Sequence, residues 1–176
     1  VVLSVNRYGL PIFTSLAAGV VLATMYAAVG GISGGNFNPA VTAGFLALRK
    51  VSVLKAISYF AAQVVGAVLA WKLYEWFTDR TIAIQTTEFD WQIFVAELVG
   101  TALFTFAIAA AVYRKLSMPA AAVTIGAGLF VGTTVASLVT LSGVLNPAVA
   151  IAVGYRPENA GYWAYLAGPV IGAVIG

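Results

Sequence analysis

The chain has 176 residues, of which 61% are hydrophobic and only 9% are charged, and its mean hydropathy is +0.97. Soluble domains commonly carry charge on about a quarter of their residues, so this composition indicates a chain whose solvent is largely lipid. The net charge of +3 comes from few, scattered bases, which argues against a nucleic-acid-binding face. The chain contains neither cysteine nor histidine, so thiolate chemistry and the commonest general base and metal ligand are excluded. We expect neither an enzyme nor a cofactor or metal site.

Two segments of about 40 residues, 8–48 and 116–155, carry no charge. One straight helix of that length would measure roughly 60 Å, about twice the hydrocarbon core of a bilayer. Each segment must therefore turn back inside the membrane. Helix breakers stand where such turns are needed: Gly30-Gly31, Gly34-Gly35 and Asn38-Pro39 in the first segment, Ser142-Gly143 and Asn146-Pro147 in the second. We predict in each a full span, an irregular stretch and a short helix of about ten residues.

Three further apolar runs predict spans near residues 56–72, 91–113 and 162–176. Lys72 can extend its ammonium group to the membrane surface at the end of the first run. Glu97 is the only charge in the second run. The third run is too short to cross a bilayer, so we expect it to continue beyond the printed sequence.

The chain repeats itself, because residues 33–41 (SGGNFNPAV) match residues 142–149 (SGVLNPAV). The halves are predicted as 1–75, with a re-entrant loop at 30–48, and 91–176, with a re-entrant loop at 141–154, joined by 76–90. Three spans separate Asn38 from Asn146, and this odd number inverts the second half in the membrane. On the same offset, residues 1–6 correspond to the end of the span that carries Glu97. We therefore expect most of a first helix upstream of Val1.

Each repeat contains Asn-Pro-Ala: Asn38, Pro39 and Ala40 in the first half, Asn146, Pro147 and Ala148 in the second. One such tripeptide indicates only a capped helix start. Two at matching intramembrane positions predict helix N-termini that meet near the bilayer centre, where their partial positive charges repel cations. The two Asn side chains are expected to donate hydrogen bonds into a lumen. Unpaired carbonyl groups are expected to line the same path at Gly34, Gly35, Asn36, Phe37, Val144 and Leu145.

The paired Asn-Pro-Ala motifs, Ala96-Glu97-Leu-Val-Gly100-Thr101 and Gln63-Val-Val-Gly66-Ala67 resemble the major intrinsic protein family of aquaporins and aquaglyceroporins. The resemblance covers nearly the whole chain. It implies an all-α membrane protein: a right-handed bundle of inverted repeats, with six spans, two re-entrant half-helices and one pore per subunit. It also implies a homotetramer, and a Glu97 that orients the re-entrant backbone. A protonated or merely satisfied packing residue is the alternative for Glu97.

The chain departs from the family pattern at the outer selectivity filter. Arginine usually follows the second Asn-Pro-Ala, whereas this chain has Val149, and the usual aromatic position falls on Ala18. The third position, often histidine, falls on Thr134, or on Val135 if the one-residue deletion lies between. The fourth falls on Gly143 or Val144. We expect a wider and more apolar filter than in a strict water channel, open to glycerol-like solutes or metalloid hydroxides as well as water.

The connections between the predicted spans differ in charge. Five bases lie in connections that contain no acid, and the positive-inside rule places them in the cytoplasm: Arg49, Lys50, Lys55, Arg114 and Lys115. We expect a multi-pass protein of the plasma membrane that passes water and small neutral solutes and excludes ions and protons. The alternative is an inverted-repeat secondary transporter, which would need a site for a coupling ion. A cation channel would need acidic rings at its mouth, and none is clearly placed.

Glycine and alanine at four-residue intervals predict close helix crossings. These small faces are Gly128-x-x-x-Gly132, the series from Gly168 through Gly172 to Gly176, and Ala62-x-x-x-Gly66.

Overall fold

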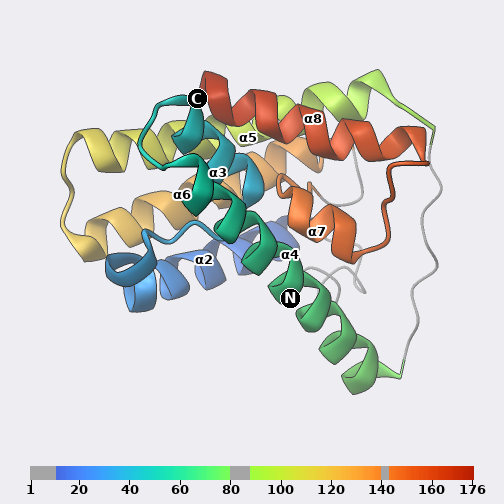
Figure 1. The fold of residues 1–176 in the computed structure, drawn as a ribbon, viewed down its shortest axis with the longest axis horizontal. Helices are drawn as coiled ribbons and strands as arrows, with labels where there is room; N and C mark the ends of the chain where they lie inside the picture. The colour runs from blue at the N-terminus through green and yellow to red at the C-terminus, as the bar shows by residue number, and fades with distance from the viewer. Residues whose placement is uncertain (1–10, 80–87, 140–142) are drawn as a thin grey trace.

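A computed structural model describes residues 11–79, 88–139 and 143–176. Those residues form seven helices: α2 (Pro11–Ser33), α3 (Pro39–Ala47), α4 (Val53–Thr78), α5 (Trp91–Tyr113), α6 (Met118–Ala136), α7 (Pro147–Ala152) and α8 (Ala160–Ile175), as Figure 1 shows. Four of them, α2, α4, α5 and α6, are long and apolar enough to cross a membrane, and α8 is a shorter apolar helix. The prediction of an all-α membrane protein is confirmed. The expected first helix lies outside the described residues.

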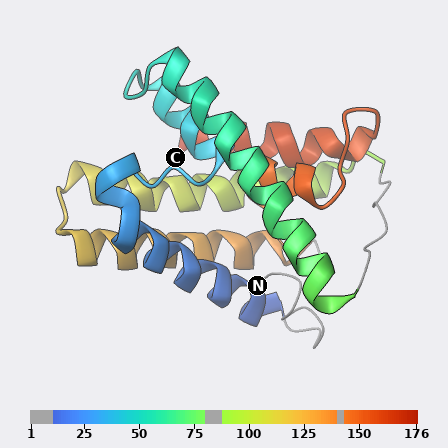
Figure 2. The same cartoon turned by 60° about the horizontal axis from the view of Figure 1, so that its bottom comes forward.

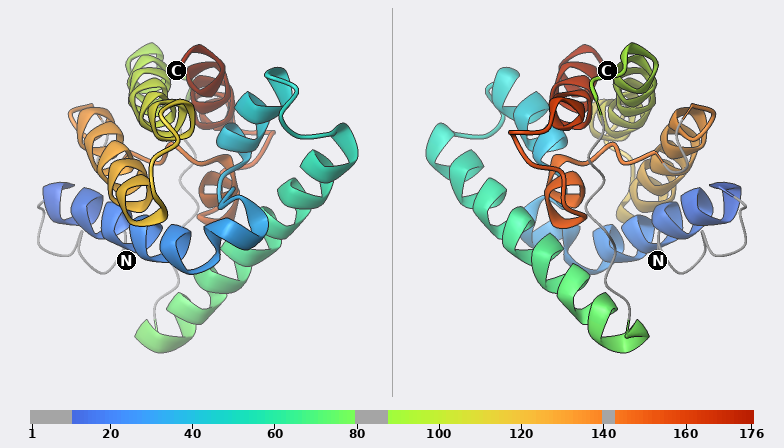
Figure 3. Two further views of the ribbon diagram at one scale, coloured as in Figure 1. Left: turned by 90° about the vertical axis from the view of Figure 1, so that its left-hand side faces the viewer. Right: turned by 90° about the vertical axis from the view of Figure 1, so that its right-hand side faces the viewer.

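The long helices frame the two short ones. Helix α5 packs against both α6 and α8, and α2 packs against α6, while α3 lies against α8 and α4, and α7 against α4. Viewed along the long axis of the molecule, α3 and α7 lie inside the frame made by the longer helices (Figure 3). The same arrangement is visible from another side in Figure 2, where α4 crosses in front of the bundle. This packing holds two short helices, and the irregular backbone before each, in the interior.

Helices α3 and α7 have nine and six residues, so the second is shorter than the ten we predicted. The backbone turns after α7 at Gly154, whose φ is 107°. Arg156 then caps the helix end, because its guanidinium donates hydrogen bonds to the Ile151 carbonyl at 2.7 Å and to the Tyr155 carbonyl at 3.0 Å. A cation is favoured at a helix C-terminus, where carbonyl groups lack helical partners.

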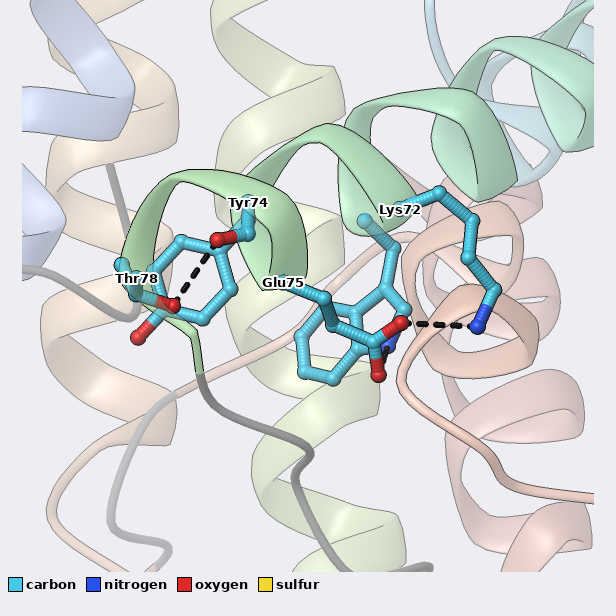
Figure 4. A network of polar contacts seen from close by, with 5 residues as sticks. Lys72, Tyr74, Glu75 and Thr78 are labelled. Carbon is cyan, nitrogen blue, oxygen red and sulfur yellow. Dashed lines mark hydrogen bonds and ion pairs between the residues drawn. The ribbon is translucent and has the colours of Figure 1, made fainter.

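Helix α4 is longer than predicted, because it covers Val53–Thr78 and not only 56–72. Lys72 therefore lies more than a turn inside the helix, and its ammonium group forms an ion pair with Glu75 at 2.7 Å. Trp71 donates its indole N–H to the other Glu75 oxygen at 3.1 Å, and the Thr78 hydroxyl donates to the Tyr74 carbonyl at 2.8 Å (Figure 4). These contacts satisfy the polar groups in the last turns of α4.

Glycines permit the closest helix crossings, as predicted for the faces of α6 and α8. A Cβ at Gly132 would collide with the Gly100 carbonyl on α5, and one at Gly168 would lie 2.8 Å from the Phe94 carbonyl oxygen. The prediction for Ala62 and Gly66 is not met within the described part of the chain. A Cβ at Gly66 would meet no atom within 4 Å, because no described helix covers that face of α4.

This contrast gives a stability prediction. Gly126→Ala places a Cβ 2.5 Å from the Gly19 carbonyl oxygen at the α2–α6 crossing, so the two backbones must separate. We expect the variant to lose about 1–3 kcal/mol of stability. Gly66→Ala is the matched control: it meets open space, and alanine favours the helix by up to about 1 kcal/mol. Thermal unfolding in one detergent compares the two, and equal melting temperatures would contradict the close crossing.

Candidate functional site: a cavity between two half-helices

The two half-helices begin in the same way. Asn38 and Asn146 are the N-cap residues, with extended φ values of −146° and −144°, and proline follows each one. The Asn38 Oδ1 atom accepts from the Ala40 amide at 2.8 Å, and the Asn146 Oδ1 atom accepts from the Ala148 amide at 3.0 Å. Each side chain thus satisfies one of the amide groups that lack a partner in the first turn of a helix.

The same two side chains join the loops to each other. The Asn38 Nδ2 group donates to the Leu145 carbonyl at 2.7 Å, and the Asn146 Nδ2 group donates to the Phe37 carbonyl at 3.1 Å. Each asparagine therefore bonds the residue that precedes the other asparagine. A side-chain amide carries two N–H donors, so each retains one for the cavity that both residues line. The structure brings the two predicted helix starts together.

Glu97 on α5 stabilises the second loop, the irregular backbone that precedes α7, through two hydrogen bonds. This side chain is fully buried, and its two carboxylate oxygens accept from the Val144 amide at 2.8 Å and the Leu145 amide at 2.6 Å. Leu145 is also fully buried, and its φ of 49° is in the left-handed region that non-glycine residues rarely adopt. The carboxylate and the Asn38 amide together fix this unfavourable conformation. This geometry supports the orienting role for Glu97 over simple packing.

The first loop is held by different chemistry. The Gln63 side-chain amide donates to the Asn36 carbonyl and, at 2.9 Å, to the Thr42 hydroxyl, while the Tyr59 hydroxyl donates to the Ser33 carbonyl at 2.6 Å. Side-chain donors on α4 thus bond two carbonyl groups of this loop, whereas Glu97 accepts from two N–H groups of the second loop. Gln63 begins the motif Gln63-Val-Val-Gly66-Ala67, which resembles the family, but the sequence alone does not predict its contact with Asn36.

A cavity of about 460 Å³ passes both asparagines. No charged residue lines it among the parts of the chain that the structure describes. The lining comes from all seven described helices and both irregular loops: Thr14, Ser15, Ala18, Leu22 and Tyr26 on α2; Gly34–Asn38; Val41 and Phe45 on α3; Trp71 on α4; Ile93, Phe104, Ile108 and Val112 on α5; Ile125, Leu129, Thr133, Ser137 and Val139 on or after α6; Gly143, Val144, Asn146, Val149, Val153 and Tyr155 around α7; and Tyr165 on α8.

Three of the four predicted filter residues, Ala18, Gly143 and Val149, line this cavity, and Thr134 does not. On α6 the lining residues recur every four positions, at Ile125, Leu129, Thr133 and Ser137, so the adjacent Thr134 points away from that stripe. Its hydroxyl donates instead to the Phe130 carbonyl at 2.7 Å. The residue that occupies this wall is Thr133.

The predicted carbonyl lining needs a similar correction. Leu145 does not line the cavity, because its side chain is fully buried and its carbonyl accepts from Asn38. The carbonyls of Asn36 and Phe37 also accept hydrogen bonds, from Gln63 and Asn146. The prediction that these carbonyl groups are unpaired is therefore wrong for Asn36, Phe37 and Leu145. Each carbonyl oxygen still has a second lone pair.

Two helical spacings could have identified further lining residues. On α2, Thr14, Leu22 and Tyr26 lie at four-residue intervals from Ala18 and share its face. On α5, Phe104, Ile108 and Val112 form a similar series in the predominantly apolar C-terminal half of the helix. Tyr155 and Tyr165, whose ring centroids are 4.5 Å apart, come together only through the fold.

The fold and this site define a class: multi-pass α-helical membrane proteins in which two half-helices meet inside a bundle at a cavity. The chain belongs to the Major intrinsic protein family, whose pattern it matches over residues 7–176.

Curated relatives include Nodulin-26 of Glycine max, 31% identical over 99% of this chain and 67% of its own length. Lens fiber major intrinsic protein of Bos taurus is 34% identical over 92% of this chain and 65% of its own length. Aquaporin Z of Photorhabdus laumondii is 32% identical over 92% of this chain and 78% of its own length. The chain thus spans about two thirds of the length of the first two relatives. The family and these relatives confirm the resemblance inferred from the paired motifs.

Proposed function

We propose that the protein is a passive channel, not an enzyme, that conducts water and small neutral solutes across a membrane and excludes ions and protons. The reciprocal hydrogen bonds of Asn38 and Asn146, in a cavity whose described lining carries no charge, carry this proposal. The names of relatives support it, since they include Aquaporin Z and a Glycerol uptake facilitator protein-like 6 of Lactiplantibacillus plantarum, which is 30% identical over 91% of this chain.

Ion exclusion follows from the polarity of the site. Both half-helices point their N-terminal ends, which carry partial positive charge, at the same part of the cavity. A water molecule there accepts hydrogen bonds from the free N–H of each asparagine, so its oxygen cannot pass a proton along a chain of waters. No acidic lining residue offsets this charge within the described residues, and a cation would have to shed water without gaining a partner.

The range of solutes is set by the other lining residues. Ala18 and Val149 are short and apolar where family members usually carry an aromatic ring and an arginine. A wall of this kind leaves room for glycerol-like solutes or metalloid hydroxides, whose carbon or metalloid cores tolerate apolar contact. Stopped-flow light scattering on proteoliposomes, with water, glycerol and a neutral metalloid acid, tests the proposal directly. Permeabilities equal to those of empty liposomes would overturn it.

Val149→Arg tests the filter assignment. Arginine at this lining position adds bulk and charge, so we expect glycerol permeability to fall by about tenfold or more and water permeability by much less. Val149→Leu is the control for added bulk without charge. Equal loss of both fluxes in Val149→Arg would contradict the assignment of Val149 to the filter.

A secondary transporter with the same inverted repeats is the second candidate. Saturable uptake that depends on an ion gradient would favour it over a channel. Glu97 is the single buried carboxylate in the described segments, and it already accepts from two backbone amides, which counts against an ion-coupling role.

We also infer that the five bases named above face the cytoplasm in the plasma membrane. Four of them lie in the α3–α4 and α5–α6 connections, and Lys55 lies in the first turn of α4. Both connections lie at the same end of the bundle in Figure 1, which supports this orientation. The chain has no cysteine, so one introduced at Lys50 can be probed with an impermeant thiol reagent from either side. Reaction of this cysteine with reagent added outside intact cells would overturn the cytoplasmic assignment.

We infer that the protein assembles as a homotetramer. Exposed apolar side chains on α2 and α4, such as Val20 and Leu69, offer surface for lipid and for neighbouring copies. Light scattering of the purified protein in detergent distinguishes a tetramer from a monomer.

A further inference from the structure

Two turns at the same end of the bundle each carry a pair of adjacent bases (Figure 1). Arg49 and Lys50 lie between α3 and α4, and Arg114 and Lys115 lie between α5 and α6. All four residues are exposed, and none of their side chains forms a hydrogen bond or an ion pair with a described residue. The acids other than the buried Glu97 lie in or beside the connections at the other end: Glu75, Asp79, Glu88, Asp90 and Glu158. The four bases therefore lack a counter-charge within the described part of the protein.

Both turns place a base where glycine is the usual residue. Arg49 and Lys115 have φ values of 56° and 50°, in the left-handed region that non-glycine residues rarely adopt. Each follows a helix end that is closed by a hydrogen bond across the turn, from the Lys50 amide to the Phe45 carbonyl at 2.8 Å after α3, and with the same spacing at 3.1 Å after α5. A positive charge is favourable at a helix C-terminus, but the neighbouring Lys50 and Arg114 supply it without the unfavourable backbone conformation. Helix capping alone therefore does not account for bases at these two positions.

Exposed apolar side chains flank both pairs of bases. Leu48 and Val53 are 65% and 64% exposed near the first pair, and Val112 and Tyr113 are 52% and 90% exposed beside the second. On a membrane protein such side chains contact lipid, and bases just beyond them lie at the level of the headgroups. The bilayer itself therefore supplies the partner nearest to the four bases.

The chemistry of these side chains selects among lipid headgroups. A phosphate accepts hydrogen bonds from ammonium and guanidinium groups, and one guanidinium group can bond two phosphate oxygens at once. Phosphatidylcholine heads carry a cation that offsets this attraction, whereas phosphatidylglycerol heads carry a net negative charge. Lys55 is not part of this set, because its ammonium group already lies over the Tyr59 ring, 5.4 Å from the ring centroid.

We propose that the two basic turns, Arg49-Lys50 and Arg114-Lys115, bind the phosphate headgroups of anionic lipids in the adjacent leaflet and so anchor the ends of α3 and α5. The two turns lie apart from each other at this end of the bundle (Figure 3), so each makes its own lipid contact. These lipids are bound constituents of the folded protein and not solutes of the passage. The inference goes beyond the proposed channel function and requires only that the helices span a bilayer.

Thermal unfolding in an uncharged detergent tests these sites, with short-chain phosphatidylglycerol and phosphatidylcholine of the same acyl chains as probes. Phosphatidylglycerol should raise the melting temperature of the wild type by about 2–4 °C, because a ligand that binds only the folded state stabilises it, and phosphatidylcholine should raise it much less. The fourfold variant Arg49→Asn/Lys50→Gln/Arg114→Gln/Lys115→Asn should lose most of this shift. Asparagine tolerates the left-handed conformation, so both turns can keep their shape. Lys72→Gln is the matched control, because it removes an exposed base near the other end and should keep the shift.

Two double variants separate lipid binding from helix capping. Arg49→Lys/Lys115→Arg conserves both charges and should keep the shift caused by phosphatidylglycerol. Arg49→Asn/Lys115→Asn should weaken that shift and yet melt no lower than the wild type in detergent alone, because asparagine is less strained than the two bases at these positions. A lower melting temperature together with a full shift would make both bases helix caps and overturn the sites.

Native mass spectrometry counts the bound lipids directly, and the wild type should retain more phosphatidylglycerol than the fourfold variant. An unchanged shift in the fourfold variant, or an equal shift with phosphatidylcholine, inorganic phosphate or an acidic peptide, would overturn the proposal. Each of these outcomes leaves the proposed channel standing, since water permeability in phosphatidylcholine liposomes tests conduction separately.

Discussion

Glu97→Ala is expected to abolish conduction and to destabilise the protein by several kcal/mol. The carboxylate accepts two backbone N–H groups in a fully buried position, and hydrogen bonds to charged groups contribute about 1.5–3 kcal/mol each. Alanine leaves the buried Leu145 amide and the partly buried Val144 amide without an acceptor in the protein. Nothing then offsets the unfavourable left-handed conformation of Leu145, so we expect its backbone to relax. Its carbonyl then loses the hydrogen bond from Asn38, and the second loop can collapse into the passage.

The measurement pairs thermal unfolding in detergent with water permeability per correctly folded protein. Glu75→Ala is the control, because it removes another helical carboxylate: it breaks an ion pair with the exposed Lys72 that contributes at most about 1 kcal/mol, and one hydrogen bond from Trp71, but no contact to the loops. Glu97→Gln provides a graded comparison: its amide retains one acceptor oxygen but turns an NH₂ group toward a backbone donor. Water flux through Glu97→Ala as fast as through wild type would show that the loop does not depend on this carboxylate.

The sequence predicted the membrane class and the re-entrant half-helices because those features depend on one-dimensional quantities. A charge-free segment twice as long as a bilayer is thick must fold back, and Asn38-Pro39 and Asn146-Pro147 mark where each short helix begins. The repeat then predicts that the two starts meet, since an odd number of spans separates them. No knowledge of side-chain contacts was needed for these steps.

The parts that could not be predicted depend on rotation and on partners distant in sequence. Thr133 and Thr134 are both threonines in a helix that is apolar around most of its circumference, so the sequence does not reveal which one faces the cavity. The exchange of amide hydrogen bonds between Asn38 and Leu145 joins residues 107 positions apart. Likewise the contact from Gln63 to Asn36 joins residues 27 positions apart, and the contact from Glu97 to Leu145 joins residues 48 positions apart. The repeat therefore predicts where each loop lies, but not which side chains bond to it.

Asn146→Asp is expected to open the channel to cations. The substitution preserves the side-chain shape and the acceptor for the Ala148 amide, so α7 keeps its cap. It replaces the donor that meets the Phe37 carbonyl with a carboxylate oxygen, which repels that carbonyl and loosens the junction between the loops. A negative charge at this point also offsets the partial positive charges of both helix starts.

We expect cation permeability to rise by about tenfold or more, which corresponds to a barrier lowered by only about 1.4 kcal/mol. Proton and potassium fluxes into dye-loaded proteoliposomes measure this increase, with water permeability recorded in the same preparation. Asn159→Asp is the matched control, since Asn159 is the N-cap of α8 and its side chain makes no capping hydrogen bond. If Asn146→Asp remained as tight to cations as wild type, the barrier would have to reside away from the paired asparagines. Because the cavity wall offers no other charge among the described residues, exclusion would then depend on passage width alone.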